Sequence, residues 1–281
     1  MAHRDVLIVD DDRRVSLILR QIFEAAGYTC RLAGDGDEGL EVFQVWRPPL
    51  VVTDVLHPGI TGIELLRQVR QEDPDAAVIV MSGNTPFTYR IESLKLGAYA
   101  FLMKPVNAYE LLITAERALE RRQLLIERRH RQQAYGQPQA DPAQRTVLIV
   151  AVEEDRPAVR DVVREIFDSA GYKCLLTGYW GRGLKAFRES RPPLVFIDLR
   201  TMVMGHAGIK LLREIREEDP DAAVIVTSAS VDPKIGIESL KLGAYAFLVK
   251  PINMDELLIT AERALEHRQL LIEHRQHQAD T

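Results

Sequence analysis

The residues most able to do chemistry in the first half of the chain are carboxylates, a hydroxyl and an amine that follow short apolar runs. They are Asp10, Asp11, Asp54, Ser82 and Lys104. Carboxylates brought together would raise one another's pKa values, and the usual remedy is a hard divalent cation such as Mg²⁺ with oxygen ligands. A metal beside a lysine and a hydroxyl makes a site for a transferring phosphoryl group. A carboxylate such as Asp54 would then be the nucleophile and form an acyl phosphate.

Alternating apolar and amphipathic segments must position these residues. Apolar runs, mostly β-branched or aliphatic, predict strands at residues 6–9, 29–32, 50–53, 77–81 and 100–102. Helical patterns lie between and after them, at residues 15–26, 36–46, 62–72, 88–96 and from 108 onward. This strict alternation predicts an α/β fold with a parallel sheet and helices on both faces. The candidate residues then lie at the carboxyl ends of strands, where open parallel sheets bind ligands.

The chain contains an internal repeat. Residues 91–120 and 237–266 differ at only four of thirty positions, and the similarity continues upstream at a slightly different offset. Between the copies, residues 133–145 are polar and contain two prolines and a glycine, which is typical of a linker. We therefore predict two domains, at residues 1–132 and 146–281, joined by this linker.

The last predicted helix of each domain is unusually long. Asn107 and Asn253 are good N-caps, each followed three residues later by a glutamate. Apolar pairs then recur every seven residues, and a helix that runs to about residue 134 would span roughly 40 Å. Because this exceeds a compact domain, the distal turns predict a short coiled coil, either between the two halves of one chain or between two chains, where it would form a homodimer. The alternative is a helix end exposed to solvent.

Composition narrows the class of protein. The net charge of −5 favours neither a nucleic-acid binder nor an acidic tail. No apolar run approaches the ~18 residues that a membrane span needs, and the start of the chain lacks a signal-peptide core, so we expect a cytoplasmic protein without membrane contact. The arginines of residues 121–131 alternate with glutamates, as on a solvated helix face, which disfavours direct nucleic-acid binding.

The first half resembles the response-regulator receiver domain of two-component signalling. The matching features are VLIVDDD at residues 6–12, Asp54 followed by Pro58 and Gly62, Met-Ser-Gly at 81–83, and Lys104 before a proline. The resemblance covers nearly all of residues 4–120. It implies a flavodoxin-like, doubly wound sheet of five parallel strands in the order 2-1-3-4-5 in each domain.

The resemblance also implies how a metal and a phosphoryl group would be held. Asp54 would be the phosphoacceptor. Asp11, Asp54 and the backbone carbonyl of Leu56 would hold Mg²⁺. Asp10 would assist through the water shell of the metal, and Lys104 would pair with the phosphoryl group.

Two more residues would form the switch that the resemblance implies. Ser82 would swing toward the phosphoryl group, and Phe101 would rotate with it. The peptide bond between Lys104 and Pro105 would be cis. His57 stands where the family usually has an apolar residue, and we expect its side chain to pack beside the loop.

The second copy keeps the residues that would handle the phosphoryl group. Asp198, Ser228, Phe247 and Lys250 match Asp54, Ser82, Phe101 and Lys104. The loop after Asp198 is two residues longer than its counterpart and has lost its proline, which puts the geometry of a metal site in this copy in question. The second domain is therefore interpreted either as a further phosphoacceptor or as a degenerate interaction module.

The metal ligands of the second copy depend on the alignment of three additional residues. Counting back from the following helix puts Glu154 and Asp155 in the places of Asp10 and Asp11, where they would hold a metal with Asp198. Counting forward from the first strand puts Ala151 and Val152 there, which leaves no ligand. We favour Glu154 and Asp155, because the apolar pattern of the helix sets its register.

These features together predict a tandem-receiver response regulator without an output domain. A histidine kinase or phosphotransfer protein would phosphorylate Asp54, and Asp198 as well if its site is functional, to switch binding of a downstream protein. We expect no enzymatic turnover beyond self-phosphorylation and self-dephosphorylation. The main alternative is an active first receiver with a second one that only dimerises or scaffolds. A remote alternative is an aspartate-nucleophile phosphatase, for which Asp54 would have no role.

Overall fold

The computed structural model describes residues 4–83, 86–135, 145–151, 159–178, 180–199, 202–229 and 233–279. The chain divides into two compact units, Met1–His130 and Arg131–Thr281. Each unit contains a five-stranded sheet in which all strand pairs are parallel. The predicted fold class is thus confirmed.

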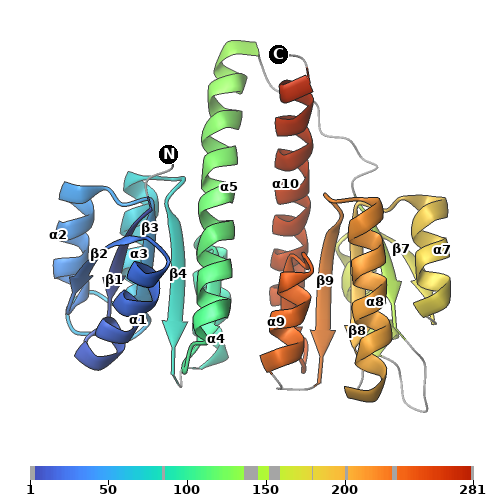
Figure 1. Cartoon of the computed structure of the whole chain (residues 1–281), viewed down its shortest axis with the longest axis horizontal. Helices are drawn as coiled ribbons and strands as arrows, with labels where there is room; N and C mark the ends of the chain where they lie inside the picture. Colours follow the sequence, from blue (N-terminus) through green and yellow to red (C-terminus); the bar gives the residue numbers. More distant parts are fainter. Residues whose placement is uncertain are drawn as a thin grey trace. The chain divides into compact units, whose positions relative to one another are not determined.

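Strands and helices alternate strictly in the first unit (Figure 1). The elements are β1 (Asp5–Val9), α1 (Arg13–Ala25), β2 (Thr29–Ala33), α2 (Gly36–Trp46), β3 (Leu50–Asp54), α3 (Gly62–Glu72), β4 (Ala77–Ser82), α4 (Phe87–Lys95), β5 (Ala100–Met103) and α5 (Ala108–Tyr135). The strand order is β2-β1-β3-β4-β5, as the resemblance implied.

The second unit repeats this architecture. Its elements are β6 (Thr146–Val150), α6 (Val159–Ser169), β7 (Lys173–Thr177), α7 (Trp180–Ser190), β8 (Leu194–Leu199), α8 (Met202–Glu218), β9 (Ala223–Ser228), α9 (Pro233–Lys241), β10 (Ala246–Val249) and α10 (Met254–Ala279). The strand order β7-β6-β8-β9-β10 corresponds position by position to that of the first unit.

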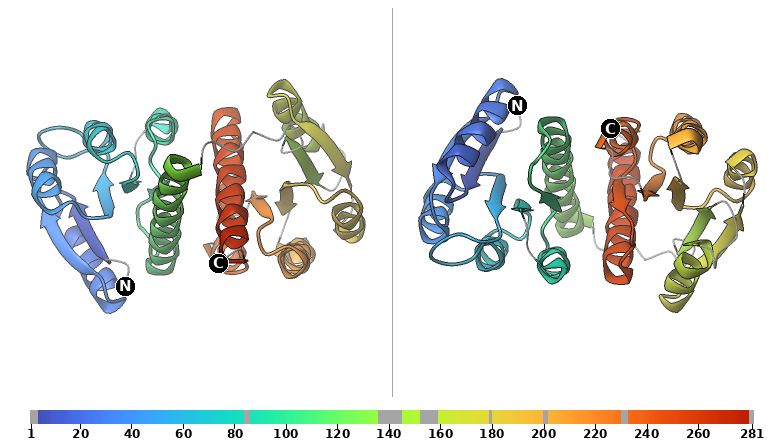
Figure 2. Two further views of the ribbon diagram at one scale, coloured as in Figure 1. Left: turned by 90° about the horizontal axis from the view of Figure 1, so that it is seen from above. Right: turned by 90° about the horizontal axis from the view of Figure 1, so that it is seen from below.

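Apolar residues form these sheets because both faces of each sheet are covered. Figure 2, which views the chain from above and below, shows helices on both sides of each sheet. On one face of the first sheet Val51 packs with Leu66 of α3, whereas its neighbour Val52 packs with Phe23 of α1 and Leu111 of α5 on the other. Burial on both faces explains why the strands lack the alternation of apolar and polar residues found in half-exposed strands.

The distal turns of each long last helix are tied to a loop of their own unit. Arg122 and Arg129 of α5 pair with Asp73 and Asp75, which precede β4, at nitrogen–oxygen distances of 2.6 and 2.9 Å. In the second unit Arg268 pairs with Asp219 at 2.8 Å, and Arg275 pairs with Asp221. The length of the helix predicts that these turns need a further partner. An acidic loop of the same domain supplies part of it, and the coiled coil stays a prediction.

We expect Arg122→Ala to lower the free energy of unfolding of the first unit by about 1–2 kcal/mol, because the Arg122–Asp73 pair is mostly shielded from solvent. The control Arg20→Ala breaks a pair that is nearly half exposed, for which ~0.3–0.5 kcal/mol is expected. Both losses of unfolding free energy are measured by urea unfolding of proteins that also carry Trp180→Phe, with the fluorescence of Trp46 as the signal. Equal losses would mean that the pair does not hold the distal helix.

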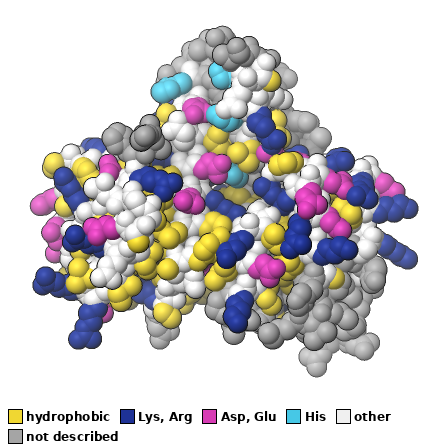
Figure 3. All heavy atoms as spheres, viewed as in Figure 1, with side chains coloured by type: hydrophobic (Ala, Val, Ile, Leu, Met, Phe, Trp, Pro, Cys, Tyr) yellow, Lys and Arg dark blue, Asp and Glu magenta, His cyan; other side chains and the backbone are white. Residues whose placement is uncertain are grey.

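The charges on one face of the molecule and the polarity of the described helices bear on two classes of partner, nucleic acids and membranes. On the face that Figure 3 shows, lysine and arginine side chains are interspersed with aspartate and glutamate side chains, as on a solvated surface. Among the residues that the structure describes, every helix is too short or too polar to cross a bilayer.

Candidate functional site

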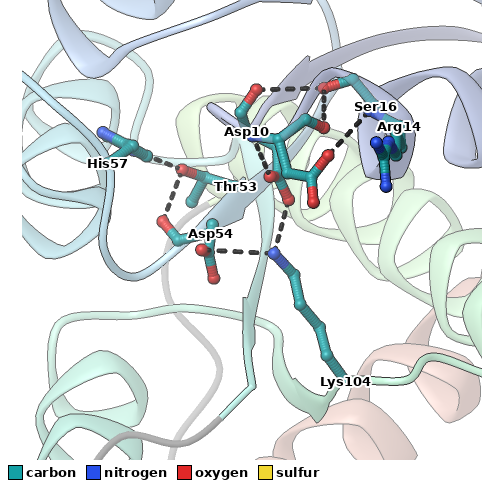
Figure 4. A network of polar contacts seen from close by, with 8 residues as sticks. Asp10, Arg14, Ser16, Thr53, Asp54, His57 and Lys104 are labelled. Atoms are coloured by element: carbon teal, nitrogen blue, oxygen red, sulfur yellow. Dashed lines mark hydrogen bonds and ion pairs between the residues drawn. The ribbon is translucent and has the colours of Figure 1, made fainter.

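The carboxyl ends of β1, β3 and β5 bring Asp10, Asp54 and Lys104 together (Figure 4). The Nζ atom of Lys104 lies 2.6 Å from Oδ2 of Asp10 and 3.2 Å from Oδ2 of Asp54. The side chain of Asp10 is fully buried, and those of the other two are less than one-fifth exposed. These predicted residues therefore form one ion-pair network in which a single ammonium group serves two carboxylates.

The turn between β1 and α1 fixes the carboxylate of Asp10. The backbone N–H of Asp12 donates to Oδ1 of Asp10 at 3.0 Å, and the Asp12 side chain caps α1 by accepting from the N–H of Arg14 at 2.8 Å. The hydroxyl of Ser16 donates to the Asp10 carbonyl at 3.0 Å. One Asp10 carboxylate oxygen is thus held by the turn while the other binds Lys104.

Three carboxylates of the first unit can share a metal ion. The ligand oxygens of Asp10, Asp11 and Asp54 lie within 4.8 Å of one another. Their three negative charges face the single positive charge of Lys104, which leaves a net negative charge that a divalent cation would offset. An all-oxygen donor set of this kind fits Mg²⁺.

The pKa values at this site reflect a balance between burial and pairing. Burial raises the pKa of Asp54, and the charge of Lys104 only partly offsets this effect. Burial lowers the pKa of Lys104, but its hydrogen bond to Asp10 and the charge of Asp54 outweigh burial and leave that pKa raised. Lys104 is therefore held as a cation beside the two carboxylates.

The loop after β3 places Leu56, whose carbonyl was predicted as a metal ligand. Its two ends are held by hydrogen bonds from the N–H of Val55 to the carbonyl of Met81 (2.9 Å) and from the N–H of Gly62 to the carbonyl of Val55 (3.0 Å). A Cβ atom on Gly62 would lie 1.9 Å from the carbonyl oxygen of Asp54, so only glycine allows this closure. The side chain of Leu56 is half exposed.

In the second unit the corresponding acid and lysine form a closer pair. Nζ of Lys250 lies 2.5 Å from Oδ1 of Asp198, and the side chain of Asp198 is only 3% exposed. Ser228 is buried, and its carbonyl accepts a hydrogen bond from the N–H of Lys250 at 2.9 Å, just as Ser82 does from Lys104 at 2.7 Å. The predicted set is therefore assembled, with Asp198 more enclosed than Asp54.

The strand register shows where the three additional residues of the second copy lie. The N–H of Ala151 donates to the carbonyl of Thr177 at 3.1 Å, as the N–H of Asp10 donates to that of Ala33 at 3.2 Å. Ala151, and not Glu154, therefore takes the backbone position of Asp10, because the hydrogen-bonded ladder continues unbroken to the end of β6.

The insertion in the second copy consequently falls after Ala151. Val152, Glu154 and Asp155 lie outside the residues that the structure describes. Their roles as metal ligands, or as replacements for them, stay predictions.

The loop after Asp198 is also rebuilt. By the repeat, the residue that matches Gly62 at the start of α3 is residue 208, yet α8 already begins at Met202. The two-residue insertion and the loss of Pro58 have thus turned most of this loop into additional turns of helix. The residue that corresponds to Leu56, two positions after Asp198, is Arg200, which lies outside the residues that the structure describes.

The family model of the response regulator receiver domain matches residues 6–116 and 147–262. The chain belongs to this family. Its two units are two receiver domains, and the recognised resemblance is confirmed. Receiver domains act in two-component systems and generally bind Mg²⁺ at an acidic pocket, which agrees with the cluster of Asp10, Asp11 and Asp54.

The curated relatives include a nitrogen assimilation regulatory protein, a response regulator and a DNA-binding transcriptional regulator. NtrX of Azorhizobium caulinodans is 39% identical over 122 residues, which are 43% of this chain and 27% of the relative. MprA of Mycobacterium ulcerans is 40% identical over 117 residues, 42% of this chain and 50% of the relative. NtrC of Escherichia coli is 24% identical over 298 aligned positions, 94% of this chain and 60% of the relative. The chain thus spans about a quarter to three-fifths of the length of these relatives.

Solved structures that resemble single domains of this chain are receiver domains as well. The receiver domain protein from Clostridium thermocellum is 30% identical, covers 43% of this chain and 98% of its own, and has a TM-score of 0.42. The NtrX receiver domain from Brucella abortus is 32% identical, covers 41% of this chain and 98% of its own, and has a TM-score of 0.40.

The predicted switch residues of the first receiver domain are buried. Ser82 at the end of β4 is 1% exposed, and Phe101 of β5 is 8% exposed within the core cluster that contains Leu66. In the second receiver domain Phe247 is partly buried and packs against the equivalent cluster. The predicted cis peptide bond is present in both domains, at Lys104–Pro105 and Lys250–Pro251.

Thr53 and His57 form a contact that sequence reasoning missed. Nε2 of His57 lies 3.1 Å from Oγ1 of the fully buried Thr53, whose hydroxyl donates to the carbonyl of Asp54 at 3.0 Å. His57 thus packs beside the loop as expected, and through Thr53 it also supports the backbone of Asp54. A threonine directly before the candidate nucleophile, within an otherwise apolar run, was the available signal.

Proposed function

We propose that this chain is a tandem-receiver regulator in which Asp54 accepts a phosphoryl group from a histidine kinase or phosphotransfer protein with Mg²⁺. The observation that carries this proposal is the cluster of Asp10, Asp11 and Asp54 around Lys104 at the carboxyl edge of a receiver sheet. The phosphorylated domain then changes its binding to a downstream protein. One of the relatives named above, MprA, is a response regulator, which supports the proposal.

The transfer step follows from the positions of Asp54 and Lys104. An oxygen of the Asp54 carboxylate attacks phosphorus, and the bond between phosphorus and the donor's imidazole nitrogen breaks with its electron pair left on that nitrogen, which then takes a proton. Lys104, 3.2 Å from Oδ2 of Asp54, is close enough to pair with an oxygen of the arriving group. Mg²⁺ held by Asp10, Asp11 and Asp54 would neutralise negative charge on the phosphoryl oxygens.

The switch would then act through residues that are buried beside Asp54. Ser82 would donate its hydroxyl to a phosphoryl oxygen. Its place beside Lys104 supports this role, because the backbone carbonyl of Ser82 accepts a 2.7 Å hydrogen bond from the N–H of Lys104. Movement of Ser82 would free space for Phe101 to rotate within the core on the side of α4. A local change in charge would thereby reach the outer surface of the domain.

We propose a different role for the second receiver domain. At the carboxyl end of β8 it offers the buried carboxylate of Asp198, which is paired with the ammonium group of Lys250 at 2.5 Å. Ala151 replaces the buried acid of the first domain, and the loop after Asp198 has become helical. This charge-balanced pair favours an interaction module over a second Mg²⁺-dependent phosphoacceptor.

Removal of the metal or of one ligand tests the proposed site. We expect Asp11→Asn to weaken Mg²⁺ binding by about tenfold or more, because one of three negative charges is lost. Phosphorylation by acetyl phosphate should fall to background both in EDTA and in this variant. Isothermal titration measures the first effect and intact mass the second.

The matched control is Asp12→Asn. Asp12 is not in the metal cluster, and an asparagine keeps the oxygen that caps α1. This variant should bind Mg²⁺ and accept the phosphoryl group as the wild type does. Labelling that persists in EDTA would contradict a metal-assisted transfer.

A further inference from the structure

The second domain carries a groove that has no part in the proposed phosphoryl site. It has a volume of about 500 Å³ and lies between α6 and α7 at the edge of the sheet. Residues that line it include Leu148, Asp168, Cys174, Leu175, Glu189 and Ser190. Its size is within the range of ligand sites.

The floor of this groove is the outer edge of a strand. β7 is the last strand of its sheet, and within the described part of the chain it pairs with β6 alone. Cys174 packs in the core cluster on the α6 side of the sheet and Leu175 in the cluster on the α7 side, yet both line the groove. The groove therefore wraps around the edge of β7, where the outward-facing N–H and C=O groups of an edge strand can pair with an added strand.

The first domain shows which groups fill this position. Arg31 and Leu175 have the same place in the registers of β2 and β7, and Trp46 and Ser190 both end the following helix. The guanidinium carbon of Arg31 lies 4.6 Å from the centroid of the Trp46 ring, so the two side chains stack over this edge. In the second domain leucine and serine replace them, and the groove is open.

The charges around the groove favour a basic ligand group. Asp168 pairs with Arg164 at 3.1 Å, which leaves Glu189 as the further acid of the lining. Glu189 is 3.7 Å from Lys185, in a pair whose side chains are at least two-thirds exposed and which contributes little. A cationic group of a ligand can therefore pair with Glu189. Glu189 lies next to Ser190, which takes the position of Trp46 in the first domain.

We propose that the edge of β7 is a docking site for an extended segment of a partner protein. The segment adds to the sheet as a strand and places an aromatic side chain over Leu175 and Ser190. A basic side chain two residues away on the segment reaches Glu189, because residues i and i+2 of a strand face the same side. Backbone pairing then supplies affinity, and the aromatic and basic groups supply selectivity.

The test uses the whole chain and a synthetic peptide, acetyl-Thr-Val-Trp-Val-Arg-Val-Thr-amide. We expect the peptide to shift the backbone amide resonances of β7 in a ¹⁵N-labelled sample. A control peptide with serine in place of tryptophan and arginine should bind at least about tenfold more weakly. The same titration is then made with the double variant Leu175→Arg, Ser190→Trp, which transfers the residues of the first domain into the groove.

The double variant should weaken peptide binding by about tenfold or more while Asp54 is phosphorylated as in the wild type. The converse variant, Arg31→Leu with Trp46→Ser and with Val45→Glu to supply the acid that corresponds to Glu189, should create peptide-dependent shifts in β2. The proposal is overturned if the peptide does not bind the wild type at millimolar concentration. It is also overturned if the serine control binds equally, or if the filled groove binds as the wild type does.

Discussion

Intact protein incubated with acetyl phosphate and Mg²⁺ should gain one phosphoryl group, and Asp54→Asn should abolish that gain. The carboxylate of Asp54 is the proposed nucleophile, and it lies within the candidate metal cluster and 3.2 Å from Lys104. An amide in its place cannot form the acyl phosphate, so we expect labelling to fall by at least about 10²-fold. Asp198→Asn should keep the single gain, because Asp198 is enclosed and paired with Lys250.

The same experiment separates the two assignments of the second domain. Two added groups, one lost in each variant, would contradict the interaction module and give both domains a phosphoacceptor role. No addition with acetyl phosphate calls for phosphoramidate as a second donor, since its leaving group differs. Failure with both donors, while the Asp10, Asp11 and Asp54 cluster binds Mg²⁺, would argue against the proposed function of the first domain.

Most of the fold could be predicted from apolar patterning. The strand expected at residues 77–81 is β4, Ala77–Ser82, and the helix expected at 15–26 is α1, Arg13–Ala25. Parallel strands buried on both faces leave unbroken apolar runs, which are easily distinguished from amphipathic helices. The failure was local: the longer loop after Asp198 was not recognised as the start of α8, although it lacks the proline that interrupts the first copy.

The candidate site could be predicted in the first domain, where the sequence allows one placement of the residues. It could not be predicted in the second domain, where the sequence allows two alignments. Asp10, Asp54 and Lys104 follow directly from strand ends, and they meet. The alignment of Ala151 against Glu154 depended on whether strand or helix sets the register, and only the hydrogen bond from Ala151 decides it. An insertion is accommodated in the connection because a break in the ladder would leave backbone groups unpaired.

The ion pairs of the long helices could also have been predicted from the internal repeat. The acidic loop with Asp73 and Asp75 recurs in the second copy, and so does the pair of arginines seven residues apart on the last helix. Seven residues are about two helical turns, which places both arginines on one face. Because the acidic loop and the arginine pair both recur, each domain holds its last helix through ion pairs of its own.

The difference in charge between the two sites predicts that Mg²⁺ restores stability when Lys104 is removed and does not when Lys250 is removed. Lys250→Met leaves the buried carboxylate of Asp198 without this counter-ion, and we expect it to destabilise the second domain by about 3–5 kcal/mol. Lys104→Met leaves Asp10 and Asp54 without theirs and should also destabilise the first domain. In that domain, however, Mg²⁺ at about a hundredfold above its dissociation constant should restore about 2.7 kcal/mol, because the metal replaces the lost charge.

Thermal unfolding in EDTA and in Mg²⁺ measures both effects, with Trp46 reporting on the first domain and Trp180 on the second when the other tryptophan is replaced by phenylalanine. The control Asp198→Asn, Lys250→Met removes both buried charges and should recover most of the lost stability. Rescue of Lys250→Met by Mg²⁺ would show that the second domain does hold a metal. The ligands of that metal would then have to include acids that follow Ala151, such as Glu154 and Asp155. The second receiver domain would then be interpreted as a phosphoacceptor.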